Sequence, residues 1–124
     1  MEANPSTLQQ AAENHRLARS FIRNGRHMEA LPLLRRTLQI RQSCKQTYQV
    51  CDIDIITVLT DIGDVFLSLA DYRQACNYLQ RAWLMCADWL GEDHDLTNES
   101  RRKWIDAEHK AEQSIMSYAA APAA

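Results

Sequence analysis

Four aspartates near the middle of the chain are the residues closest to a catalytic or metal-binding arrangement. They are Asp52, Asp54, Asp61 and Asp64. Carboxylates of this kind can bind cations or act as general acids and bases. Their spacing, however, matches a helix start followed by one helix face, and no histidine lies among them to complete a transition-metal site. The aspartates therefore predict no metal centre.

The histidines and cysteines form no recognised catalytic pattern. The four histidines lie in different segments, and none belongs to a metal motif such as HExxH. The four cysteines have neither zinc spacing nor CxxC spacing, which favours reduced thiols in a cytosolic protein. A glycine-rich phosphate loop is also missing from the sequence. We expect a protein that is not an enzyme and that uses no cofactor.

Charged residues at helical spacing offer a different chemistry. Arg16, Arg19 and Arg23 follow one another at i, i+3 and i+7, so they share one face of a helix. The planar fork of arginine suits carboxylates of a partner, and Asp61 and Asp64 supply an opposite charge elsewhere. Two interpretations stay open. The charges form a bipolar groove for a partner, or they are solvated and pair with each other across neighbouring helices, where they contribute little.

A second basic cluster stands at the start of the last predicted helix, at Arg101, Arg102 and Lys103. One interpretation is a patch for an acidic partner or for phosphate. The other is the solvated face of a capping helix, because terminal repeats need a polar outer surface.

The totals limit the partners and the location. With 124 residues the chain forms one domain, and its net charge of −2 gives no indication of nucleic-acid binding. No apolar run reaches membrane-spanning length, and the N-terminus lacks the features of a signal peptide. We expect no membrane insertion and a cytoplasmic location, with cytoskeletal association left open. Glycine and proline number three each, which favours an all-α fold.

Helices must position these side chains. The predicted helices span about 5–24, 27–43, 52–70, 72–90 and 95–118. Asn4 is the expected N-cap of the first helix, Gly25 ends it, and Asp52 or Asp54 caps the third. Residues 43–51 are expected to form a polar connector. Residues 1–4 and 119–124 are expected to be disordered.

The stretch from Ile56 to Leu90 predicts a tight helical hairpin. Apolar residues recur at helical spacing on both sides of a break at residues 70–72. Small residues stand where two closely crossing helices need them, at Gly63, Ala75 and Ala82.

The hairpin has an earlier copy in the chain. With Gly25 placed over Ala70, Phe21 falls on Phe66 and Leu34 on Leu79, an offset of 45 residues. Self-similarity at such a period marks a helical repeat array.

These residues resemble the tetratricopeptide repeat family. The similarity lies in residues Leu59, Ile62, Gly63, Phe66, Tyr72, Ala75, Leu79 and Ala82. Residues 30–41, with their internal proline, and the turn at residues 90–94 are similar to repeats of the kinesin-light-chain type. The resemblance covers about residues 11–97. Asp61 departs from the groove asparagine that is common in such repeats, and the heptad coiled coil that joins light chain to motor is missing, so motor binding is not implied.

The resemblance implies an all-α, α-α superhelix. Two TPR-like hairpins, at about 11–44 and 56–90, are followed by a capping helix at about 95–118, within a domain of residues 5–118. The first helix of each pair lines a concave groove. The implied groove residues are Ala12, His15, Arg16, Arg19, Ile22, Arg23, Thr57, Thr60, Asp61, Asp64, Leu67 and Ser68.

The expected function is a protein–protein interaction module, a TPR adapter or scaffold that holds a peptide or helix of another protein in this groove. The alternative is a structural subunit of a large cytoskeletal or axonemal-type assembly, or a homodimer. That alternative follows because two repeats fall short of the three usually needed for an independent array, so the core would be completed against a neighbour.

Overall fold

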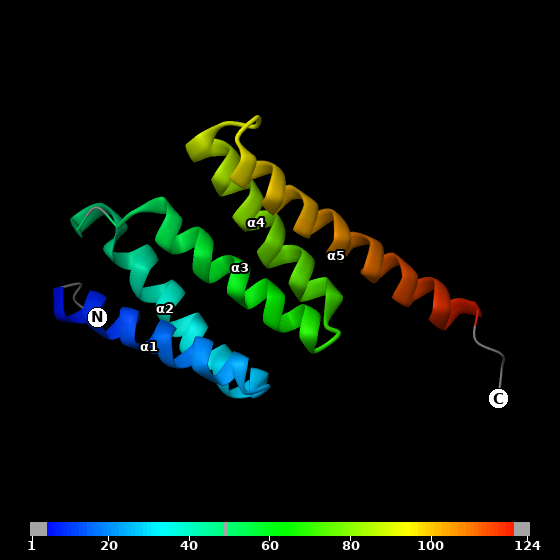
Figure 1. Cartoon of the computed structure of the whole chain (residues 1–124), viewed down its shortest axis with the longest axis horizontal. Coiled ribbons are helices and arrows are strands. Elements are labelled where there is room, and N and C mark those ends of the chain that lie inside the picture. Colours follow the sequence, from blue (N-terminus) through cyan, green and yellow to red (C-terminus); the bar gives the residue numbers. More distant parts are fainter. Residues whose placement is uncertain (1–4, 49, 121–124) are drawn as a thin grey trace.

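The computed structural model describes residues 5–48 and 50–120, and all regular structure in those residues is helical. The five helices follow one another along a zigzag path (Figure 1). Their bounds are α1 Pro5–Arg23, α2 His27–Tyr48, α3 Asp52–Ser68, α4 Tyr72–Leu90 and α5 Asp95–Ala120. The predicted all-α fold is confirmed, and none of these helices combines the length and apolar character needed to cross a membrane.

Each helix packs mainly on the next helix in the chain. Helices α1 and α2 form one hairpin, α3 and α4 form a second, and α5 lies along α4. The contact between α2 and α3, which joins the hairpins, is smaller. This arrangement is an α-α superhelix of two hairpins followed by a C-terminal helix.

The two hairpins turn in the same way, 45 residues apart. After α1, Gly25 has a φ of 76° and Arg26 N–H donates to Phe21 O at 2.8 Å. After α3, Ala70 has a φ of 59° and the N–H of residue 71 donates to Phe66 O at 2.9 Å. Both are Schellman endings, in which a left-handed residue lets the chain satisfy the last carbonyls of the helix. The structure thus confirms the predicted alignment of Gly25 with Ala70.

The second hairpin is held by a very close helix crossing. A Cβ atom placed on Gly63 would lie 2.6 Å from Leu79 Cγ and 3.5 Å from Ala75 O. Ala75 and Ala82 are almost fully buried, so the predicted small-residue contact is confirmed. Around it lies a core built from both hairpins, whose largest fully buried side chains include Leu34, Val58, Ile62, Val65 and Leu79.

The connector between the hairpins is shorter than the sequence predicts. Helix α2 continues through Tyr48, so most of residues 43–51 are helical. The extension has a cause: Cys44 is fully buried against Ala11 and Ile40, and Lys45 Nζ forms an ion pair with Asp52 Oδ1 at 2.7 Å. The apolar contact of Cys44 and the ion pair of Lys45 therefore stabilise the additional turn of α2.

Two end predictions are also corrected, and others lie outside the described residues. Cys51 is the N-cap of α3 and no side chain caps it, so Asp52 and Asp54 are first-turn residues and not caps. Helix α5 reaches Ala120, so residues 119 and 120 belong to it and not to a disordered tail. The Asn4 cap and the expected disorder of residues 1–4 and 121–124 lie outside the described residues.

Helix α5 packs on α4 through its first half and then runs beyond it. Trp104 stacks on Trp83 with ring centroids 4.9 Å apart, and Ala107 is fully buried near Leu79. From residue 112 to residue 118 every side chain is exposed, including three large apolar ones, Ile115, Met116 and Tyr118. The last turns of α5 stand clear of the other helices (Figure 1).

Candidate functional site

An open cavity of about 230 Å³ lies along α3, between it and α5. We call it the α3–α5 groove. Apolar side chains of Ile53 and Ile56 on α3 and of Leu96 on α5 form much of its wall. Its other lining residues are Arg19, Thr57, Thr60, Asp61, Asp64, Cys86, Glu99, Ser100 and Lys103. Helices α1, α3 and α5 all contribute to it, so the first helix of each hairpin and the last helix share this face.

The threonines of the groove use their hydroxyl hydrogens within α3. Thr57 Oγ1 donates to Ile53 O at 2.6 Å, and Thr60 Oγ1 donates to Ile56 O at 2.9 Å. A hydroxyl whose hydrogen is engaged still has lone pairs that can accept. The α3 wall can therefore receive hydrogen-bond donors of a bound chain between its apolar side chains.

Two ion pairs join α3 to the helices on either side. Arg19 Nε on α1 donates to Asp61 Oδ2 at 3.0 Å, and Lys103 Nζ on α5 donates to Asp64 Oδ2, also at 3.0 Å. Asp61 is mostly buried, with 18% of its side chain exposed, whereas the other three side chains are between 39% and 48% exposed. For Arg19, Asp61 and Asp64, pairing across neighbouring helices is thus the interpretation that the structure supports.

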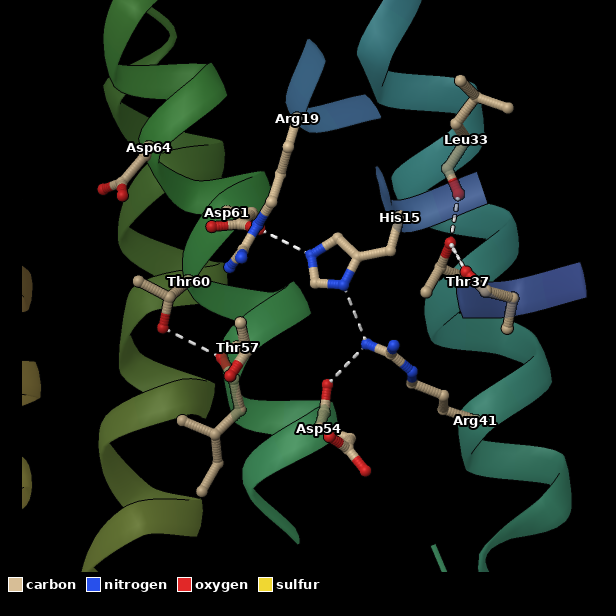
Figure 2. A network of polar contacts seen from close by, with 12 residues as sticks. His15, Arg19, Leu33, Thr37, Arg41, Asp54, Thr57, Thr60, Asp61 and Asp64 are labelled. Atoms are coloured by element: carbon tan, nitrogen blue, oxygen red, sulfur yellow. Dashed lines mark hydrogen bonds and ion pairs between the residues drawn. The ribbon is translucent and has the colours of Figure 1, made fainter. Parts of the chain in front are cut away.

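Behind Asp61 lies a buried imidazole. His15 is 8% exposed, and its Nε2 is 2.7 Å from Asp61 Oδ2. Its Nδ1 is 3.1 Å from Arg41 Nη1, which also donates to Asp54 O at 2.9 Å. Figure 2 shows the ring held between the aspartate on one side and the guanidinium on the other. Three helices, α1, α2 and α3, meet in this set of contacts.

Burial and neighbouring groups shift the pKa values of Asp61 and Arg41. Burial disfavours the charged form of Asp61, but hydrogen bonds from His15 and Arg19, together with the charge of Arg19, outweigh it, so the pKa of Asp61 lies below its ordinary value. Burial lowers the pKa of the Arg41 guanidinium, helped by the charge of Arg19 and opposed by Asp54 and Asp61. Asp61 is accordingly an anion in this site over a wide pH range.

The other sequence-predicted groove residues lie at its margins or outside it. Ile22 lines a separate cavity of about 100 Å³ that Asp61 and Asp64 also border. Ser68 lines this smaller cavity as well. Leu67 is half-buried and packs with the core clusters between α3, α4 and α5. Three residues of α1 are exposed and do not line the groove: Ala12, Arg16 and Arg23.

The second basic cluster is divided. Arg101 and Arg102 are exposed on α5, whereas Lys103 lines the groove and holds Asp64. Lys103 therefore belongs with the groove, and the remaining two arginines form a smaller patch on the α5 surface.

Sequence reasoning missed the α5 side of the groove and the partner of His15. Leu96, Glu99, Ser100 and Lys103 follow the i, i+3, i+4, i+7 spacing of one helix face, a signal that was available in the sequence. Arg41 carries no comparable signal, because its place beside His15 depends on how α1 crosses α2.

The reactive side chains do not gather into a site of their own. Within residues 5–48 and 50–120, no three histidine, cysteine, aspartate or glutamate residues are grouped as metal ligands. Cys44, Cys76 and Cys86 are buried free thiols, and Cys51 is exposed. Burial raises the pKa of the Cys76 thiol, and Glu108 adds to this effect, so Cys76 is kept in its less reactive protonated form.

Comparison with known proteins gives no match among family models, curated proteins or solved structures.

Proposed function

We propose that this chain is a non-catalytic protein–protein interaction module that binds a peptide or helix of a partner protein in the α3–α5 groove. We propose tetratricopeptide repeats as its family, because its hairpins resemble such repeats, in particular those of the kinesin-light-chain type. We also propose a cytoplasmic location, with cytoskeletal association left open, and no role for nucleic acid or a cofactor.

The observation that carries the proposal is the composition of the groove. Ile53 and Leu96 are 37% and 41% exposed, and they face a cavity of about 230 Å³ that can take an apolar side chain. Accepting oxygens of Thr57 and Thr60 lie beside them. Apolar side chains next to a few fixed polar groups are the usual composition of a binding site, since the first supply affinity and the second fix orientation.

Outside the groove, two exposed arginines that share a helix face with Arg19 suit a segment with at least one acidic residue. Arg16 and Arg23 are exposed on α1, on either side of Arg19, and only Arg19 of the three forms an ion pair with an aspartate among the described residues. The guanidinium groups of Arg16 and Arg23 are exposed to solvent, so a partner carboxylate can pair with them without displacing an aspartate of the chain. Such rim charges act mainly on the association rate and on selectivity.

The test uses matched charge insertions on exposed leucines. Leu96→Glu places an anion in the groove, and Leu84→Glu places one on the exposed surface of α4, where Leu84 is 52% exposed. Immobilised wild type and both variants are incubated with lysate of the native source, and retained proteins are identified by mass spectrometry. We expect a partner that wild type and Leu84→Glu retain and that Leu96→Glu loses. Retention by all three proteins would show that the groove is not the binding surface.

The alternative function is a structural subunit, or a homodimer, that completes its packing against a neighbour. The observation in its favour is the free end of α5, where Ile115, Met116 and Tyr118 are 69%, 69% and 87% exposed. Sedimentation analysis of the purified chain separates the two functions. A cooperatively folded monomer supports the adapter. Concentration-dependent association that Ile115→Gln with Met116→Gln abolishes supports the subunit.

A further inference from the structure

His15 lies between two groups with opposite hydrogen-bonding properties. Its Nε2 faces the carboxylate oxygen of Asp61 at 2.7 Å, and its Nδ1 faces the guanidinium nitrogen Nη1 of Arg41 at 3.1 Å. Because His15 is on α1, Arg41 on α2 and Asp61 on α3, one imidazole ring joins three helices (Figure 2).

These partners fix the protonation state of the ring. Arginine has only donors, so Nδ1 accepts from Arg41 and carries no hydrogen. An ionised carboxylate only accepts, so Nε2 carries the hydrogen and donates it to Asp61. The arrangement therefore requires a neutral imidazole with its hydrogen on Nε2.

We propose that His15 is a proton-controlled tie between the helices: the neutral ring links α1 to both α2 and α3, and the protonated ring releases Arg41 while keeping Asp61. A second proton can be added only at Nδ1. It would place two donors and two positive charges 3.1 Å apart, so the bond to Arg41 is lost. The bond from Arg41 to Asp54 O does not involve the ring, so the Arg41 side chain should stay hydrogen-bonded to α3.

Some charged groups around the His15 ring favour its protonated form and others oppose it. Asp61 on α3 favours the protonated ring, and the carboxylate of Asp54 acts on Arg41. Arg41 on α2 and Arg19 on α1 oppose it. Arg19 Nε and His15 Nε2 share the same oxygen, Asp61 Oδ2, at 3.0 Å and 2.7 Å. A charged His15 holds that oxygen more strongly, and the half-exposed Arg19 side chain is then free to turn towards the groove that it lines.

Acidification should therefore loosen the link between α1 and α2, strengthen the link between α1 and α3, and release Arg19. This inference concerns the free chain, so it stands or falls separately from the proposed partner binding.

The experiment is a pH titration of the full chain, uniformly labelled with nitrogen-15, in which NMR follows the imidazole and guanidinium nitrogens. We expect the His15 ring to carry hydrogen on Nε2 alone at high pH. Its protonation should coincide with a change at the Arg41 guanidinium and with shifts of amide signals around Ala11 and Arg41. Signals of the exposed His94 and His109 rings serve as internal references in the same spectra.

Two variants test the cause. Arg41→Met removes the group that requires a neutral ring, so the midpoint of the His15 transition should move to higher pH. Asp61→Asn removes the group that favours the charged ring, so the midpoint should move to lower pH. Arg73→Met, at an exposed position on α4, is the control and should leave the midpoint unchanged.

Circular dichroism establishes that each variant keeps its helices. A hydrogen on Nδ1 of wild-type His15 at neutral pH would overturn the proposal, and so would a folded Arg41→Met variant with an unchanged midpoint. If Arg41→Met fails to fold, the ring tautomer of the wild type and the Asp61→Asn midpoint decide the question.

Discussion

Gly63 and Leu79 lie so close together that the hairpin of α3 and α4 has no room for one more methyl group. A Cβ atom at position 63 would be 2.6 Å from both Leu79 Cγ and Leu79 Cδ2. We predict that Gly63→Ala lowers the free energy of unfolding by about 1–3 kcal/mol, the usual cost of overpacking. At an exposed helical position the same change would raise it by about 1 kcal/mol.

A double-mutant cycle with urea denaturation checks this contact. Leu79→Ala should cost less in the Gly63→Ala background than in the wild type, because truncating Leu79 makes room for the new methyl group. If the effects of the two substitutions were additive, the close contact between Gly63 and Leu79 would not be the cause of the loss of stability.

The two Schellman turns predict opposite effects of exchanging alanine and glycine. Ala70 has a φ of 59°, a conformation that costs a residue with a Cβ atom about 1–2 kcal/mol. We expect Ala70→Gly to raise the unfolding free energy by about 1 kcal/mol and Gly25→Ala to lower it by a similar amount. Nothing lies within 4 Å of a Cβ atom at position 25, so the effect there is that of the backbone alone. Thermal unfolding of both variants is the measurement, and equal signs would refute the explanation.

Asp61 predicts a pH-dependent contribution to stability. Its pKa is lower folded than unfolded, so the contribution is present above the unfolded value of about 4 and is lost as pH falls through the folded value. Asp61→Asn should lower the unfolding free energy at neutral pH by about 1–3 kcal/mol, as for a hydrogen-bonded charge. The difference from wild type should shrink as the pH falls below about 4.

Asp88→Asn is the matched control for Asp61, since Asp88 is exposed on α4. Urea denaturation at several pH values should give it nearly the wild-type profile. If the difference between Asp61→Asn and wild type stayed constant down to the lowest pH, the ion pair would not be its cause.

The stacked rings of Trp83 and Trp104 predict how α5 is held. Trp104→Ala removes both the stack and much of the apolar contact between α4 and α5, and should cost about 3 kcal/mol. Trp89→Ala should change stability by less than about 1 kcal/mol, because Trp89 is 44% exposed. Near-ultraviolet circular dichroism reports the loss of the ring pair, and urea denaturation reports its energetic effect.

Local signals made the hairpins predictable. The helix end at Gly25, the break at residues 70–72, the small residue at Gly63 and the spacing of apolar residues all act within a few residues of their own position. The 45-residue offset then located the second copy, and the repeated turn geometry at Gly25 and Ala70 confirms that alignment.

Features that depend on contact between distant segments were not predictable. The extension of α2 to Tyr48 follows from Cys44 packing on Ala11 and from Lys45 pairing with Asp52. The burial of His15 follows in the same way from the crossing of α1, α2 and α3. His15 and Asp61 were identified as facing one groove, yet the choice between charges that face a partner and charges that pair with each other required the structure.

Packing of each helix on its neighbour in the chain has a consequence for how the protein folds. Contacts between segments close in sequence form quickly, because little loop entropy opposes them, and arrays of this kind can begin to fold at either hairpin. The bonds from His15 and Arg19 to Asp61 join residues 46 and 42 positions apart. They should therefore form late and break early, so that Asp61→Asn changes the unfolding rate while the folding rate stays close to that of the wild type.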